Sequence, residues 1–265
     1  MKRTTSLFLL IAFLGCQTVP GTGRRQFNLV PMGQQLQMGD QAYAEMLGNA
    51  QIVTSGADYV MVQRVGQRIA RAANKLYPDP SKQFDWEFKL VKDDATVNAW
   101  ALPGGKSAVY TGLLKVTQDE ESLAAVMGHE AAHAIAQHGA ERITQTMGLQ
   151  LGLTAVGAYI GSRESMSSGQ RDAILAGLGA GASVGIMLPF SRSHESEADE
   201  IGVYIAGAAG YNPEAAIGLW ERMADLGGDK PPEFLSTHPS EATRIADLKK
   251  AMPRAKRYYK RSQGR

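Results

Sequence analysis

The stretch GHEAAH at residues 128–133 decides the fold and much of the chemistry expected of this chain. His129 and His133 are four residues apart, so on an α-helix with 3.6 residues per turn they share one face. Two imidazoles on one helical face can hold a zinc ion. Glu130, directly beside them, can polarise a zinc-bound water.

The residues around this stretch favour a helix. Thr117 to Glu120 form a capping box, and acidic residues follow at the positive end of the expected helix. Apolar residues recur behind them at helical spacing as far as Ile135. A helical H-E-x-x-H is the pattern of zinc peptidases, and the alternative is a chance match on a surface helix.

A catalytic zinc site has three protein ligands plus water, so a third ligand is needed. The stretch HESEAD at residues 194–199 offers Glu195. Asp199, one turn further on the same face, is placed to accept the outer N–H of a ligand histidine. Glu197 points to another face and is expected to be exposed. The alternative for these acidic residues is a solvated helix face.

All of the chain's histidines lie in or beside candidate site segments: His129, His133, His138, His194 and His238. His138, one turn beyond His133, is expected near the site or on the surface rather than as a ligand. Helical geometry turns His194 away from the face of Glu195, so a structural role is expected for it.

The composition is that of a globular protein of one large domain or two small ones. The chain has 265 residues, of which 44% are hydrophobic and 20% charged. The net charge of +2 gives no case for a nucleic-acid partner, and none is expected. Residues 253–265 are expected to form a solvated basic tail, with binding to phosphate or lipid headgroups as the alternative.

The first residues have the form of an export signal. A positive start precedes an apolar run at residues 7–14 that is too short to span a bilayer. The single cysteine, Cys16, excludes an intramolecular disulfide and a cysteine-built zinc site. The Gly15-Cys16 ending resembles a bacterial lipoprotein signal, although Phe13 stands where Leu is usual. We therefore expect a signal peptide at 1–15, lipidation at Cys16 and a tether at 16–31, with a plain secreted protein as the alternative.

The remaining periodicities predict an α+β protein that is predominantly helical. Helices are expected over 34–50 and 58–76, and strands over 84–90, 98–101 and 106–110. The apolar segment 145–190 is expected to be a helical hairpin packed inside the protein, with contact to a membrane or a partner as the alternative. The main domain is expected to span 32–252.

Several segments together resemble the gluzincin family of the CAAX prenyl proteases and HtpX, most closely its BepA- and LoiP-like bacterial lipoprotein members. Beside H-E-x-x-H and the HESEAD stretch, the similar segments are TGRRQ at 22–26, NAWALPGG at 98–105 and STHP at 236–239. The resemblance implies a zincin-type metallopeptidase with a small sheet whose edge strand lies by the active-site helix.

The resemblance also assigns roles. It implies one zinc ion per chain on three ligands: His129, His133 and Glu195. Glu130 would be the general base, and Asp199 would orient a ligand histidine. His238 and Arg244 would face the tetrahedral intermediate or the substrate carbonyl. The strand 106–110 would be the edge to which an extended substrate adds.

The expected function is a zinc-dependent metalloendopeptidase that cleaves misfolded or unassembled cell-envelope proteins. Gln17 after the lipidated cysteine favours the outer membrane, so we expect the periplasm of a Gram-negative bacterium and the inner leaflet of its outer membrane. The outer-membrane assembly machinery is a candidate partner. The rival hypothesis is a lipoprotein chaperone or assembly factor whose zinc site is latched by His238 as a fourth ligand; the presence of Glu130 favours chemistry.

Overall fold

The structure is a computed structural model that describes residues 15–161, 167–170, 191–226, 233–238 and 242–264. The strands are β1 (Cys16–Thr18), β2 (Arg25–Phe27), β3 (Ile52–Val53), β4 (Glu87–Val91), β5 (Ala99–Ala101) and β6 (Lys106–Tyr110). The longer helices are α2 (Met32–Leu47), α3 (Ala57–Leu76), α6 (Glu120–Ile135), α7 (His138–Gly161), α9 (Arg192–Ala208), α10 (Ala215–Asp225) and α12 (Ala242–Ser262). The short helices are α4 (Pro78–Ser81), α5 (Thr111–Thr117) and α11 (Glu233–Thr237).

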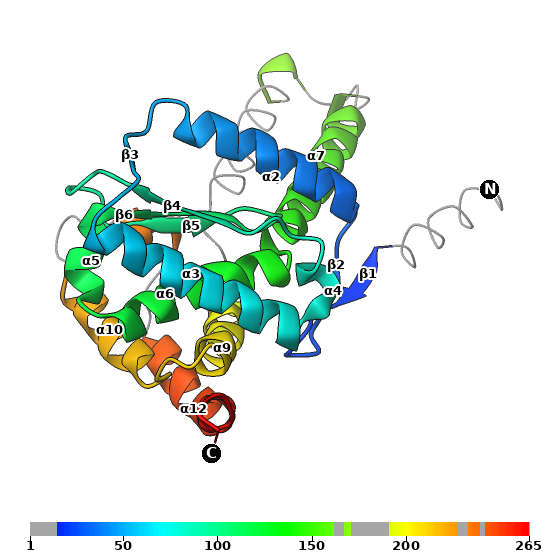
Figure 1. Cartoon of the computed structure of the whole chain (residues 1–265). Coiled ribbons are helices and arrows are strands. Elements are labelled where there is room, and N and C mark those ends of the chain that lie inside the picture. Colours follow the sequence, from blue (N-terminus) through cyan, green and yellow to red (C-terminus); the bar gives the residue numbers. More distant parts are fainter. Residues whose placement is uncertain (1–14, 162–166, 171–190, 227–232, 239–241, 265) are drawn as a thin grey trace.

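These elements confirm a predominantly helical α+β fold in layers. In Figure 1, α2 crosses one face of the small sheet, and α3 and α6 cover the other face. Helices α9 and α12 form a further layer beyond α6. Helix α6 is therefore enclosed on all sides, and its residues from Ser122 to Ile135 are all buried. A helix in that position can carry a dry, rigid site.

The main sheet has the order β3-β4-β6-β5, with β4 parallel to β6 and the other pairs antiparallel. The strands predicted at 98–101 and 106–110 are confirmed. The strand predicted from residue 84 begins only at Glu87, because Glu87 pairs with Lys106, the first residue of β6. Residues 84–86 therefore have no partner strand in the described sheet.

The expectation that strand 106–110 forms the sheet edge is wrong. Strand β6 lies between β4 and β5, and β5 is the edge strand of the described sheet, beside α6. The Pro103–Gly105 turn folds β5 back along β6 in antiparallel register. The Asn98 C=O accepts from the Tyr110 N–H, and the Leu102 N–H donates to the Lys106 C=O, so these two residues face β6. Backbone groups alternate in direction along the strand, so those of Ala99 and Ala101 point away from β6.

Helices α6 and α9 cross with their backbones in contact. A Cβ atom on Gly128 would lie 2.7 Å from the carbonyl oxygen of Gly202, and one on Gly202 would lie 2.8 Å from the backbone nitrogen of His129. Neither position can hold a side chain without moving a helix. The two glycines thus bring the histidine face of α6 against the acidic residues of α9.

The start of α6 differs slightly from the prediction. Its N-cap is Asp119, whose carboxylate accepts a hydrogen bond from the Ser122 backbone N–H at 2.7 Å. Thr117 instead ends α5, and Gln118, with φ of 66°, makes the turn between the two helices. The local sequence therefore marked the helix start correctly to within two residues.

Residues 16–31 are not a simple tether. Strands β1 and β2 pair as a hairpin, in which Val19 is fully buried. Hydrogen bonds tie the segment that follows β2 to the body: the Asn28 amide donates to Gln137 Oε1 at 3.0 Å, and the Leu29 backbone N–H donates to Thr144 Oγ1 at 2.9 Å. Arg24, in the hairpin itself, binds Glu141 and Glu197. The signal predicted at 1–15 lies almost entirely outside the described residues.

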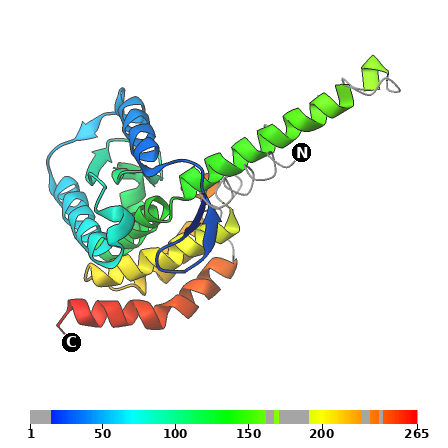
Figure 2. The same ribbon diagram turned by 90° about the vertical axis from the view of Figure 1, so that its right-hand side faces the viewer.

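Of the predicted hairpin at 145–190, the structure describes residues 145–161, as the end of α7, and residues 167–170. Figure 2 shows α7 projecting away from the body of the protein. Its apolar side chains are exposed: Met147, Leu149, Leu151, Val156 and Tyr159. Internal packing is therefore wrong for the end of α7, and residues 171–190 lie outside the described ranges. Among the described helices, none has the length and apolar character that crossing a membrane requires.

Residues 253–262 continue α12 and are not an unstructured tail. Ala255 is fully buried against α9, while Lys256 pairs with Glu214 at 2.7 Å on the outer face. The basic side chains therefore lie on the solvent side of a packed helix, where composition alone had indicated a free tail.

Candidate metal centre

The two histidines of the H-E-x-x-H stretch lie side by side in the interior. Their Nε2 atoms are 3.1 Å apart, and the side chains of His129 and His133 are 2% and 4% exposed. About one helical turn separates the two residues along α6, which puts both side chains on one face, and their rings converge at the Nε2 atoms. The Nε2 atoms of the two rings thus face one common point.

Glu195 faces that point from α9. Its carboxylate oxygens lie 3.4 Å from each of the two Nε2 atoms, and its side chain is 1% exposed. Ser191 caps α9 by accepting the His194 backbone N–H at 3.3 Å, which places Glu195 in the first helical turn. The structure thus brings together the three ligands expected from the sequence.

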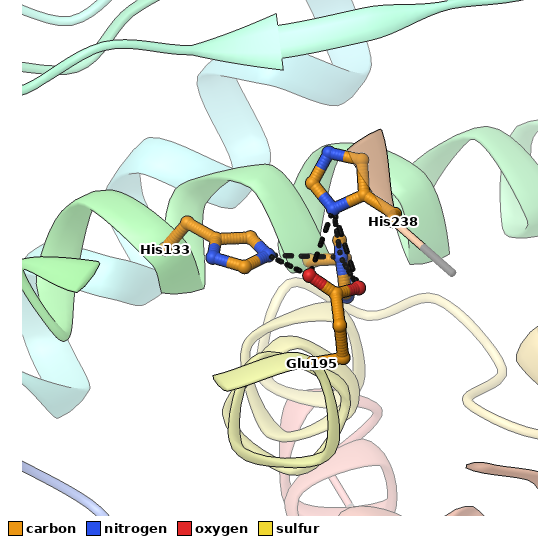
Figure 3. Close-up of side chains that lie close together, drawn as sticks. His133, Glu195 and His238 are labelled. Carbon is orange, nitrogen blue, oxygen red and sulfur yellow. Dashed lines mark hydrogen bonds and ion pairs between the residues drawn. The ribbon is translucent and has the colours of Figure 1, made fainter. Parts of the chain in front are cut away.

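A fourth side chain completes the cluster. His238 follows α11, and its Nδ1 atom lies 3.1 Å from Glu195 Oε1 and 3.3 Å from His129 Nε2 (Figure 3). Its ring stacks on Phe234 with centroids 4.6 Å apart. Four buried side chains from three helical segments therefore converge: His129, His133, Glu195 and His238.

The spacing of these atoms fits a zinc ion. Four ligand atoms placed tetrahedrally 2.0–2.1 Å from a central zinc lie about 3.4 Å from one another. The ligand atoms of His129 and Glu195 lie 3.1 to 3.4 Å from those of the other residues, and all four ligand atoms lie within 4.8 Å of one another. Imidazole nitrogen and carboxylate oxygen are ordinary zinc donors, so both the geometry and the donor chemistry suit the metal.

The electrostatics of the cluster favour a cation. Burial opposes a charge on His129, but hydrogen bonds to Asp199 and Glu195 outweigh it and raise its pKa to about 9. Burial lowers the pKa of His133 well below its usual value. The pocket therefore attracts one positive charge, and a metal would compete with the proton for it.

Asp199 and Arg244 support the first histidine. Asp199 Oδ1 accepts the Nδ1–H of His129 at 2.9 Å, as expected for a residue that orients a ligand. Arg244 Nε and Nη2 donate to the same carboxylate at 2.7 and 2.8 Å. Burial raises the pKa of Asp199, but the Arg244 guanidinium outweighs it and keeps that pKa below its ordinary value.

Arg244 contacts both buried carboxylates of α9. Its guanidinium is 3% exposed, stacks 3.7 Å from the Trp220 ring centroid and also lies 3.1 Å from Glu195 Oε2. Two buried carboxylates require a cation beside them. Arg244 therefore holds Asp199 and Glu195 in place, and its role toward a substrate carbonyl stays a prediction.

The surroundings of the Glu130 carboxylate differ from those of the four clustered side chains. Its side chain is buried, and Oε1 has no hydrogen-bond partner within the described residues. His238 Nε2 lies 3.5 Å from that oxygen. Burial raises the pKa of Glu130. A carboxylate with an unsatisfied oxygen beside a metal centre is suited to take a proton from water.

A second buried polar cluster borders the site. Glu197 was expected to be exposed, but it is 6% exposed and hydrogen-bonded to His138 and Arg24. It lies on the far side of α9 from Glu195, and the N-terminal segment covers that side. Arg24 and Glu141, which complete the cluster, were not singled out from the sequence. The resemblance of segment 22–26 to the family was the one signal that pointed to Arg24.

The comparison with protein families identifies the family of this chain. The sequence profile of peptidase family M48 matches residues 58–252, about three quarters of the chain. The chain belongs to peptidase family M48. The resemblance seen in the sequence is thereby confirmed, and the protein is a metallopeptidase by family.

Named relatives of this M48 protein include mitochondrial and bacterial proteases. The mitochondrial metalloendopeptidase OMA1 of Schizosaccharomyces pombe is 34% identical over 248 residues, which are 92% of this chain and 68% of that protein. The beta-barrel assembly-enhancing protease of Escherichia coli K12 is 31% identical over 235 residues, which are 88% of this chain and 46% of that protein. The mitochondrial metalloendopeptidase OMA1 of Bos taurus is 31% identical over 266 residues, covering 94% and 48%.

Proposed function

We propose that this M48 protein is a zinc-dependent endopeptidase that cleaves misfolded or unassembled cell-envelope proteins. The observation that supports it most is the spacing of His129, His133 and Glu195 at zinc-ligand distances with Glu130 directly beside them. A site that merely stored a metal would not require a buried carboxylate with an unsatisfied oxygen at that position.

Each residue of the site has its own role in the proposed reaction. His129, His133 and Glu195 would hold one zinc ion, which when bound lowers the pKa of water and polarises the scissile carbonyl. Glu130 takes the proton from the attacking water and returns it to the leaving amine. Asp199 keeps the His129 ring oriented, and Arg244 keeps Asp199 ionised.

The edge strand β5 is the proposed substrate-binding strand. Its outward N–H and C=O groups belong to Ala99 and Ala101, and β5 packs beside the helix that carries Glu130. The Ala99 N–H donates to Asn98 Oδ1 at 2.9 Å, and the Ala101 N–H bonds to the Glu130 carboxylate, so an incoming peptide would replace these two bonds. An extended peptide that pairs with this edge is recognised through its backbone, which tolerates many sequences. Such recognition suits unfolded substrates, because only they can offer an extended segment.

We further propose a lipid anchor at Cys16 and a periplasmic location at the outer membrane. Cys16 is exposed at the start of β1, so a modified cysteine there would not disturb the core. The name of the Escherichia coli relative favours a role near β-barrel assembly, whereas other relatives are named as mitochondrial. The test is fractionation of cells that express the Cys16→Ser protein. We expect loss of the membrane-bound form, and an unchanged membrane fraction would contradict the anchor.

The substrate class is tested with one outer-membrane β-barrel protein in two states. The purified full-length chain is incubated with that protein unfolded and, separately, folded in detergent. We expect cleavage of the unfolded form only. Equal cleavage of the folded form would contradict recognition of extended segments.

A second candidate function is a lipoprotein chaperone or assembly factor with a latent zinc site. The position of His238 Nδ1 among the other three donors favours it, because a fourth protein ligand would fill the place that water needs. Binding of the unfolded β-barrel protein without cleavage would support this function over proteolysis.

A further inference from the structure

The second ligand histidine has its own chain of support, on the side away from Asp199. Nδ1 of His133 lies 2.9 Å from Nδ1 of His138. Only one of two neutral rings can carry the hydrogen between these nitrogens. Since Nε2 of His133 faces the other donors, its Nδ1 carries the hydrogen and donates to His138.

The direction of this hydrogen bond fixes the next one. With Nδ1 accepting, His138 carries its hydrogen on Nε2 and donates it to Glu197 Oε2 at 2.9 Å. His138 is fully buried, and the side chain of Glu197 is 5% exposed. Each ring therefore has one tautomer that satisfies both of its nitrogens, and the chain of bonds ends on a carboxylate.

Arg24 holds that carboxylate from the N-terminal hairpin. Its Nε donates to Glu197 Oε2 at 2.8 Å, and Thr22 Oγ1 donates to the other oxygen. The two Nη groups of Arg24 donate to both oxygens of Glu141 at 2.9 and 2.7 Å. Such charge-assisted and bidentate bonds are the strong and geometrically selective ones.

Glu141 closes the arrangement around His138. It accepts the Nε2–H of His194 at 3.0 Å, and the His194 ring stacks on the His138 ring with centroids 4.4 Å apart. Arg24 thus fixes His138 twice, through the carboxylate that accepts its hydrogen and through the ring that lies on its face.

The two ligand histidines are supported in parallel ways. Asp199 accepts the outer N–H of His129 and is held by Arg244. For His133 the same task is shared by His138 and Glu197, and the cation is Arg24. We propose that Arg24 is a positioning residue for the metal centre, which holds Glu197 so that His138 fixes the ring orientation and tautomer of His133.

This inference rests on the proposed zinc centre. It makes the hairpin between Cys16 and α2 a part of the metal site, although its strands lie more than a hundred residues before HESEAD in the sequence. Partners that orient a ligand histidine typically affect metal affinity by about 10–100-fold.

The test compares zinc binding by the full-length chain in detergent with that of two single-charge variants. Arg24→Gln removes the cation, and Arg25→Gln removes its exposed neighbour, the first residue of β2, as a matched control. The dissociation constant is measured by competition with a chelator, and the visible spectrum of the cobalt-loaded protein reports ligand geometry. We expect about 10–100-fold weaker zinc binding and an altered cobalt spectrum for Arg24→Gln, with no change for Arg25→Gln.

The possible results distinguish the role of Arg24 from the existence of the zinc site. Wild-type protein that binds no zinc would overturn the metal centre itself. Wild-type zinc binding with unchanged affinity and spectrum in Arg24→Gln would overturn the role of Arg24 alone. If Arg24→Gln does not fold, Glu197→Gln carries the same test: its amide oxygen can still accept from His138, but it lacks the charge that Arg24 holds. Wild-type affinity in that variant would also overturn the inference.

Discussion

His238 and Glu195 meet at 3.1 Å between Nδ1 and Oε1, at the point where the two helical histidines also converge. A catalytic zinc site keeps one position open for water, while a site with four protein ligands is closed. The other ring nitrogen of His238 faces Glu130 at 3.5 Å. The His238 side chain thus lies between Glu195, the proposed third ligand, and Glu130, the proposed base, and its removal would affect both.

Replacing His238 by alanine tests whether it closes the site. If His238 is a fourth ligand in the resting protein, His238→Ala opens a coordination position and raises the rate of casein cleavage while one zinc per chain remains bound. Ser236→Ala, an exposed position on α11, is the control and is expected to behave as wild type. An unchanged or lower rate in His238→Ala with zinc bound would count against the latch, and a lower rate would support a direct role of His238 toward the substrate carbonyl.

Replacing Glu195 by glutamine tests the third ligand. The neutral amide is a poor zinc donor, so the loss of zinc affinity should exceed the ~10–100-fold typical of losing an outer hydrogen-bond partner. Glu200→Gln is the control on the same helix. The Glu200 carboxylate accepts a hydrogen bond from Tyr204 and does not join the cluster, so this variant should bind zinc like the wild type. Stoichiometric zinc in dialysed Glu195→Gln protein would exclude Glu195 as a ligand.

The helix crossing can be tested by adding one methyl group. Gly202→Ala places Cβ 2.8 Å from the His129 backbone nitrogen and forces α6 and α9 apart. We expect the free energy of unfolding to fall by about 1–3 kcal/mol, as for other overpacked interiors, together with weaker zinc binding. Gly152→Ala on α7, where nothing lies within 4 Å of the new atom, should raise the free energy of unfolding by up to about 1 kcal/mol. Equal effects of the two substitutions would contradict the close crossing.

The pH dependence of cleavage should report the burial of Glu130. The base acts in its ionised form, and burial raises its pKa above the ordinary value of 4.5. Activity should therefore be full above the raised pKa and should fall as the pH drops through it, at a higher pH than for an exposed glutamate. The measurement is kcat/KM against pH with the zinc content determined at each point. An acid limb centred at or below pH 4.5 in zinc-loaded protein would contradict this environment for Glu130.

The sequence was most informative where structure depends on near neighbours. The helix around His129 and His133 follows from spacing and a cap, and the strand 106–110 follows from alternation and a turn. What it could not supply was the arrangement of elements far apart in the chain. Strand order made β5 the edge, although β6 has the stronger strand pattern.

The burial of Glu197 likewise depends on a segment far away in the chain. Its helix has a polar face at that position, and solvent is the default neighbour of a polar face. The residue that covers it, Arg24, lies in a short hairpin without apolar periodicity. Arg244 was recognised through its family motif, but its contacts with Asp199 and Trp220 became visible only in three dimensions.

The central claim is tested most directly by casein cleavage with wild-type protein and with Glu130→Gln, with zinc measured on both. The account predicts one zinc per chain in each protein and cleavage by the wild type only. Zinc in both with equal cleavage would contradict Glu130 as the base. Absence of zinc from the wild type would contradict the metal centre.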